Sequence, residues 1–215
     1  MGGARYFKTI DNAWLLYGNG DSVDKLAADW NSYKAIFIDI NGTCIPWLCS
    51  AEWYDFKEMS ENFRNGMPCL IKNAAYTNKD VVLNSDSHTT DNINTLTGLK
   101  GLDDYIAFNA GRDYPRFISK RKEGENRPYA LKHFEILAQR LGHSMDECLL
   151  IADGATDYET AEHFGYNYFD LPMLLEKHEG IRDQVFHNLL RRVGFYEKYA
   201  PAPYYDSAFM QNIRN

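Results

Sequence analysis

Short apolar runs that end in polar turns recur along the chain and predict the strands of a sheet. The runs cover residues 34–39, 80–86, 104–110, 148–154 and 167–171. The first, KAIFID, is almost continuously apolar, which is typical of a strand buried on both faces. It leads directly into the polar turn Asn41-Gly42, so we expect this strand to end near Asp39.

Helical spacing appears between these runs and after the last one. Residues 127–142 begin with Pro128 in a predicted first turn and end at Gly142. The apolar positions in this segment recur at spacings of three and four: Leu131, Phe134, Leu137, Ala138 and Leu141. Residues 157–165 predict a short helix, and residues 174–199 an interrupted helical segment. Strands and helices in alternation predict an α/β fold, a three-layer sandwich with a mainly parallel, Rossmann-like sheet.

Composition narrows the class of protein. The 215 residues suit one domain, and the net charge of −7 argues against a nucleic-acid or anionic-membrane binder. The four cysteines show no paired spacing of metal ligands, so we expect buried, reduced thiols. No apolar run is long enough for a transmembrane segment. We therefore expect a soluble, cytoplasmic protein, with secretion by a non-classical route left open.

Polar side chains follow three of the predicted strands. Asp39, Ser85 and Asp153 each stand at the carboxyl end of a strand, and Asp157 follows within the turn ADGATD. The carboxyl ends of parallel strands meet at one sheet edge, where ligands of α/β proteins bind. Carboxylates gathered there repel each other unless a cation lies between them. Their hard oxygen atoms suit Mg²⁺.

Two motifs resemble those of the haloacid dehalogenase-like (HAD) hydrolases. IFIDINGT, residues 36–43, resembles the first motif, Asp-x-Asp-x-Thr after an apolar strand. LLIADGATDYETAEHFGY, residues 149–166, resembles the fourth, with ENRPYALKHFEILAQRLG upstream resembling the Lys-Pro helix. The resemblance covers about residues 34–171. It implies a HAD-type phosphatase in which Asp39 forms an aspartyl-phosphate. Mg²⁺ would be bound by Asp39, Asp153, Asp157 and the backbone carbonyl of Asn41.

The resemblance also assigns the residues around the phosphoryl group. The second motif needs a Ser or Thr at the next strand end, where Ser85 fits best and Thr77 is the alternative. Thr43, Asn84 and His88 are expected to contact the substrate.

The third motif needs a lysine, and at the matching place the chain has Arg127. Arginine keeps the charge and can bind two oxygens. Lys120, Lys122 and Lys132 are nearby substitutes, each of which we expect to be an ordinary solvated side chain.

Asn41 departs from the family pattern, in which this position is an Asp that serves as general acid and base. An amide can do neither. One explanation is a phosphatase whose leaving group needs little help, such as the phenol of phosphotyrosine, or whose acid is Asp86 or His88. The second is the metal-independent dehalogenase branch. The third is an inactive relative that binds a ligand or acts as a scaffold.

The segments between the motifs leave room for little or no cap domain. Residues 44–56, CIPWLCSAEWYDF, are a candidate flap. A weakly capped site favours a large phosphorylated substrate, such as a phosphoprotein. We expect residues 1–33 to be an N-terminal extension packed on the core, residues 34–175 the catalytic core, and residues 176–215 a C-terminal helical extension of the same domain.

Overall fold

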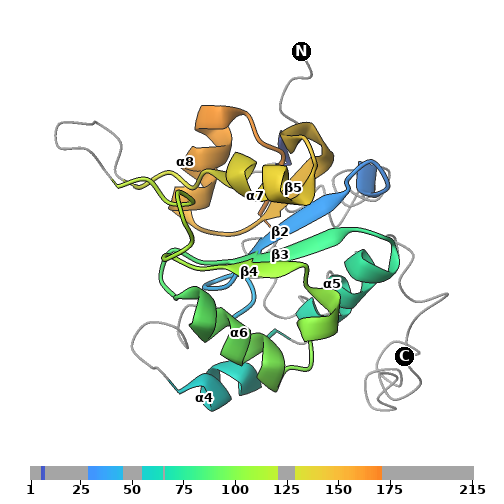
Figure 1. Cartoon of the computed structure of the whole chain (residues 1–215), viewed down its shortest axis with the longest axis vertical. Coiled ribbons are helices and arrows are strands. Elements are labelled where there is room, and N and C mark those ends of the chain that lie inside the picture. Colours follow the sequence, from blue (N-terminus) through green and yellow to red (C-terminus); the bar gives the residue numbers. More distant parts are fainter. Residues whose placement is uncertain (1–5, 8–28, 46–54, 65, 121–128, 171–215) are drawn as a thin grey trace, which may run out of the picture.

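A parallel sheet of six strands forms the centre of the computed structural model, which describes residues 6–7, 29–45, 55–64, 66–120 and 129–170 (Figure 1). The strands are β1 (Tyr6–Phe7), β2 (Ala35–Asp39), β3 (Asp80–Asn84), β4 (Phe108–Ala110), β5 (Cys148–Ile151) and β6 (Tyr168–Phe169). Their order is β1-β6-β5-β2-β3-β4, and every pair is parallel. The predicted α/β fold with a parallel sheet is confirmed.

Helices cover both faces of this sheet. On one face lie α4 (Phe56–Glu61), α5 (Met67–Tyr76) and α6 (Thr90–Leu99), and on the other lie α7 (Phe134–Leu141) and α8 (Ala155–Phe164) (Figure 1). Side chains of β2 alternate between the two layers: Ile36 and Ile38 join the first core, Phe37 the second. This alternation directs Asp39 to the α7/α8 face.

Four of the five predicted strands appear at their predicted places, with shorter ends. The segment 104–110 is different, because its first part belongs to a short 3-10 helix, η1 (Asp103–Tyr105), and only Phe108–Ala110 is a strand. A second 3-10 helix, η2 (Met145–Glu147), precedes β5. Sequence patterns gave no indication of β1, which pairs with β6 at the sheet edge.

The helix expected from residue 127 begins only at Phe134, and the described residues 129–133 before it are not helical, contrary to the prediction. Residues 131–133 instead run antiparallel to residues 117–119. Ser119 N donates to the Leu131 carbonyl at 2.9 Å, and His133 N donates to the Phe117 carbonyl at 2.6 Å. These backbone bonds hold residue 132 in an extended segment above the sheet edge. The helix then ends as predicted, at a left-handed Gly142.

Several predictions concern residues outside the described ranges, namely Pro128, the centre of the candidate flap, Cys49 and the C-terminal helical segment. Cys44, Cys69 and Cys148 are buried free thiols, as expected. Trp30 and Tyr33 of the N-terminal extension lie in the core. In the part of the chain that the structure describes, no separate cap domain stands between β2 and β3. None of its helices has the length and apolar character of a membrane span.

Candidate active site

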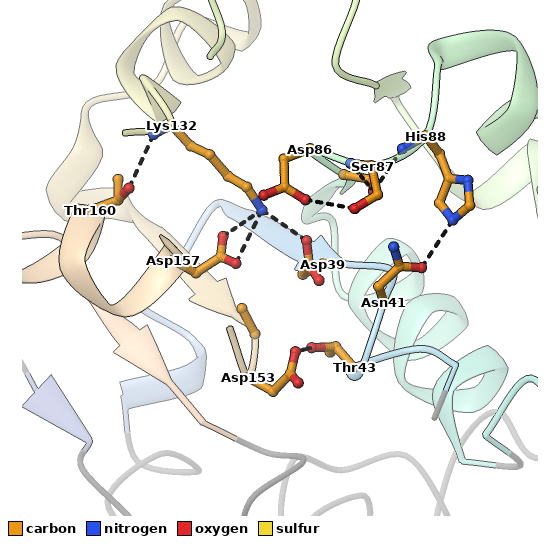
Figure 2. A network of polar contacts seen from close by, with 12 residues as sticks. Asp39, Asn41, Thr43, Asp86, Ser87, His88, Lys132, Asp153, Asp157 and Thr160 are labelled. Carbon is orange, nitrogen blue, oxygen red and sulfur yellow. Dashed lines mark hydrogen bonds and ion pairs between the residues drawn. The ribbon is translucent and has the colours of Figure 1, made fainter. Parts of the chain in front are cut away.

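Acidic and amide side chains converge at the carboxyl edge of the sheet, where β2, β3 and β5 end (Figure 2). Asp39 ends β2, and its register partner on β3 is Asn84. Asp153 follows β5 by two residues, and Asp157 lies in the first turn of α8. The fold therefore brings together Asp39, Asp153 and Asp157, as the sequence predicted.

A buried lysine joins two of these carboxylates. Lys132 Nζ donates to Asp39 Oδ1 at 2.9 Å, and to Asp157 Oδ1 and Oδ2 at 2.9 and 3.0 Å (Figure 2). Its side chain is 1% exposed. The backbone N–H of Lys132 donates to Thr160 Oγ1 at 3.0 Å, which ties the lysine to α8. The expectation that Lys132 is an ordinary solvated lysine is wrong.

Burial and charge together set the protonation of this cluster. Burial alone would lower the pKa of Lys132, but the carboxylates of Asp157 and Asp39 outweigh it and raise that pKa, so the ammonium keeps its proton. Burial raises the pKa of Asp39 well above its ordinary value. Lys132 opposes that rise, while Asp157 and Asp153 add to it. Burial likewise raises the pKa of Asp157 against the effect of Lys132. The ammonium of Lys132 therefore favours the ionised form of both carboxyl groups, whereas burial opposes it.

Asn41 contacts a histidine from the neighbouring turn. His88 lies between β3 and α6, and its Nε2 is 3.0 Å from Asn41 Oδ1 (Figure 2). Both side chains are buried. Burial and the nearby charge of Arg112 lower the pKa of His88. His88 thus lies beside Asn41, and its expected contact with the substrate stays a prediction.

Ser85 uses its hydroxyl within its own turn. Its Oγ accepts hydrogen bonds from the backbone N–H groups of Ser87 (3.1 Å) and His88 (3.2 Å). Asn84 instead lies beside Asp39 on the same face of the sheet. It is 1% exposed, and within the described residues its Oδ1 has no hydrogen-bond partner. The unpaired atom is an acceptor, so a ligand would have to donate a hydrogen bond to it.

Thr77 lies at the opposite edge of the sheet. It caps the carboxyl end of α5, where its hydroxyl donates to the carbonyls of Asn73 and Ala74. Because β3 begins only at Asp80, Thr77 precedes the strand and stands far from its carboxyl end. Thr77 as the alternative second-motif residue is wrong.

A tight turn after β2 brings Thr43 to Asp153. Gly42 has φ +81°, a left-handed conformation that costs little only for glycine. Thr43 Oγ1 donates to Asp153 Oδ1 at 3.0 Å. Arg64 stabilises the turn: its Nε donates to the Thr43 carbonyl at 2.9 Å, and its Nη2 donates to the Gly42 carbonyl at 2.8 Å. Sequence reasoning missed Arg64, because nothing in the pattern around it marks it.

The donor set fits a hard divalent cation. Three carboxyl groups (Asp39, Asp153 and Asp157) surround one ammonium (Lys132), and the charge of Asp153 adds to the rise in the pKa of Asp39. In the described ranges, no three His, Cys, Asp or Glu side chains gather closely enough to hold a metal by themselves. Mg²⁺ needs no such cage, because it keeps several waters and binds one or two carboxylates. Asp39 and Asp153 are the carboxylates that would bind it here.

The cation that contacts Asp39 is Lys132, whereas the sequence predicted Arg127 for this role. Arg127 and Lys122 lie outside the described residues, and Lys120 is exposed. Lys132 reaches Asp39 because residues 131–133 are extended and paired with residues 117–119, and neither feature is visible in the helical spacing of this segment.

Fold and site together define an α/β protein with a lysine–carboxylate cluster at the carboxyl ends of parallel strands. No protein-family model matches the chain, and no curated protein matches it significantly.

Several solved structures resemble the fold. A candidate HAD-superfamily hydrolase (subfamily III A) from Legionella pneumophila has 12% identity and a TM-score of 0.48, covering 93% of this chain and 100% of its own. A candidate 3-deoxy-D-manno-octulosonate 8-phosphate phosphatase from Vibrio cholerae has 11% identity and a TM-score of 0.45, covering 83% and 93%. The N-terminal part of a Bacteroides fragilis protein, containing a phosphatase domain complexed with Mg, has 13% identity and a TM-score of 0.49, covering 86% and 46%.

Proposed function

We propose that this chain is a HAD-type, Mg²⁺-dependent phosphatase that hydrolyses a phosphomonoester through an aspartyl-phosphate on Asp39. The observation that carries the proposal is the contact of Lys132 with both Asp39 and Asp157 in a buried cluster. A buried cation beside a strand-end carboxylate offsets the negative charge of both nucleophile and phosphoryl group.

The proposed reaction has two steps. A carboxylate oxygen of Asp39 attacks phosphorus, and the bond between phosphorus and the leaving-group oxygen breaks with its electron pair on that oxygen. Water then attacks the aspartyl-phosphate, which releases inorganic phosphate and restores the carboxylate. Lys132 Nζ lies 2.9 Å from Asp39 Oδ1, so its charge also stabilises the transferring oxygens.

Other residues of the site take supporting roles in the proposal. Asp157 holds the ammonium of Lys132 through both carboxylate oxygens, which favours a role as lysine partner over one as metal ligand. Ser85 Oγ accepts from two backbone N–H groups in its turn, so its hydroxyl hydrogen would still donate to a phosphoryl oxygen. Asn84, next to Asp39, would donate its amide N–H to another phosphoryl oxygen. Mg²⁺ bound by Asp39, Asp153 and the Asn41 carbonyl would supply further charge neutralisation.

Aryl phosphates, including phosphotyrosine on proteins, are the proposed substrate class. Asn41 has no proton to give, so the leaving group must depart as an anion. A phenol, with a pKa near 10, leaves in this way far more readily than an aliphatic alcohol.

Phosphate release from an aryl phosphate and a phosphotyrosine peptide tests the proposal. With Mg²⁺ present, the wild-type protein should release phosphate, and Asp39→Asn should reduce the rate by at least about 1,000-fold because the amide cannot attack phosphorus. Acid-quenched wild-type protein should carry covalent phosphate that Asp39→Asn lacks. Asp104→Asn, on the exposed helix η1, is the matched control and should behave as wild type.

Two results would contradict the proposal. Equal phosphate release by wild type and Asp39→Asn would leave a binding or scaffold protein as the better description. Halide release from a 2-haloacid with the metal chelated would assign the chain to dehalogenation.

A further inference from the structure

The side chain of Asn41 has one hydrogen-bond contact within the described residues, and it comes from His88. The two atoms are Asn41 Oδ1 and His88 Nε2, 3.0 Å apart. An amide oxygen only accepts, so Nε2 must carry the hydrogen. Nε2 carries a hydrogen in the imidazolium and in one neutral tautomer, so the contact does not depend on the charge of the ring.

The backbone around His88 is held on three sides. Its N–H donates to Ser85 Oγ at 3.2 Å, and its carbonyl accepts from Arg112 N at 2.8 Å. Gly111 packs so closely that a Cβ there would lie 2.6 Å from the His88 carbonyl oxygen. His88 as a residue is 7% exposed, and its Nδ1 is buried without a partner among the described residues. Asn41 is therefore the one polar group in this part of the chain that fixes the ring.

This contact decides which end of the amide faces the site. With Oδ1 turned to His88, the Asn41 nitrogen is on the other end of the amide, toward the turn that carries Asp86 and Ser87 (Figure 2). We propose that His88 is a positioning residue that fixes Asn41 as a hydrogen-bond donor to the leaving-group oxygen of the substrate. The proposal rests on the proposed phosphatase function and names the group that replaces a proton donor there.

A fixed donor has a recognisable effect on specificity. It stabilises negative charge on the departing oxygen without transferring a proton. The stabilisation grows with the charge that develops, so it matters most for poor leaving groups. Without His88 the amide can rotate and present its oxygen, which would repel the departing anion.

The orientation is tested without turnover, by long-range ¹H–¹⁵N correlation of the histidine rings. The chain has six histidines, and His88→Gln identifies the His88 signal by its loss. We expect a hydrogen on Nε2 of His88. A neutral ring with its hydrogen on Nδ1 would require the amide of Asn41 to be reversed and would overturn the proposal, whatever the activity.

The effect on the reaction is tested with a series of aryl phosphates whose phenols differ in pKa. His88→Leu removes the donor, and kcat/KM should fall about 10-fold for the poorest leaving group and change little for the best. His88→Gln places an N–H near the Nε2 position and should retain most of the wild-type dependence on leaving-group pKa. His143→Leu is the matched control, because His143 contacts Asp80 at the start of β3.

The outcomes separate the two proposals. Equal loss of kcat/KM for all substrates in His88→Leu, or the same loss in His88→Gln, would show a merely structural histidine and overturn the inference. Absence of phosphate release by the wild type would overturn the proposed function and with it the role toward a leaving group, while the ring spectrum still decides the orientation of Asn41.

Discussion

Lys132 is the residue on which the charge balance of the site depends. It is one of two buried lysines in the described ranges, and only it contacts carboxylates. The other, Lys79, donates to the Tyr33 carbonyl at 2.8 Å and lies over the ring of Trp30. Burial lowers the pKa of Lys79, whereas carboxylates raise that of Lys132. The two lysines therefore form a natural comparison.

Replacing Lys132 by Met should destabilise the protein by about 3–5 kcal/mol, because two buried carboxylates lose their counter-charge. Lys79→Met removes a buried charge that has no carboxylate partner, so its cost should be about 1 kcal/mol or less. Urea unfolding of both variants at neutral pH, without added metal, measures the difference. Similar losses for the two would show that Lys132 does not neutralise Asp39 and Asp157.

The position of a site residue could be predicted from the sequence when that residue directly follows a strand. Asp39 and Asp153 stand directly after apolar runs, so their place at the sheet edge follows from the pattern of the chain. No local pattern indicates the position of Lys132, because that position depends on backbone pairing with a segment more than ten residues earlier. The contact of His88 with Asn41 joins two turns and was likewise invisible from local sequence.

At the level of elements, the first turn of α6 packs closely against the residues that follow β4. Thr90 N and Oγ1 donate to Asp113 Oδ1 at 2.7 and 2.9 Å, and Gly111 N donates to Thr90 Oγ1 at 3.0 Å. A Cβ on Gly111 would lie 2.2 Å from Thr90 N. Only glycine allows this approach, which also places His88.

Gly111→Ala should therefore destabilise the protein by at least about 2 kcal/mol, because backbone atoms must move apart to admit the methyl group. Gly98→Ala, within α6, is the matched control: its Cβ would meet Asp103 Oδ2 at 3.4 Å, an ordinary contact. It should be neutral or stabilising by up to about 1 kcal/mol. Thermal unfolding of both variants checks this, and a harmless Gly111→Ala would contradict the packing argument.

Elements with strong periodicity were predicted better than those set by tertiary pairing. β2, β3 and β5 follow from their apolar runs, and α8 ends at Gly165 as the sequence indicates. The start of α7 was misplaced because helical spacing continues upstream through Leu131, although pairing of the backbone with residues 117–119 prevails there. β1 is too short for any periodic pattern.

For the whole molecule, the carboxyl groups gathered at one edge should couple metal binding to stability. Mg²⁺ that binds only the folded protein stabilises it by about 2.7 kcal/mol at 100 times its dissociation constant. For a chain of this length we expect the unfolding temperature to rise by roughly 5–10 °C. Asp153→Asn should abolish most of this rise, since it removes one of the two proposed carboxylate ligands.

Thermal unfolding in Mg²⁺, in chelator and in salt of matched ionic strength measures the effect. The salt control matters because the net charge of −7 makes the protein sensitive to general screening. An equal rise for wild type and Asp153→Asn would place the bound metal elsewhere.

The sequence predicted that the sheet is mainly parallel, but it did not predict the full order of the strands. Alternating strands and helices imply parallel pairing with crossovers, but the position of β1 beside β6 depends on contacts between the two ends of the described chain.

The strand order also has a consequence for synthesis on the ribosome. β2, which carries Asp39, lies between β3 and β5, so one of its neighbours is made more than a hundred residues after it. At a translation rate of about 5–20 residues per second, the edge of β2 that pairs with β5 remains unpaired for on the order of 5–20 s. During this interval an apolar strand with open hydrogen-bonding groups is exposed to other nascent chains. The strand that carries Asp39 therefore keeps one unpaired edge until residue 148 and its neighbours emerge.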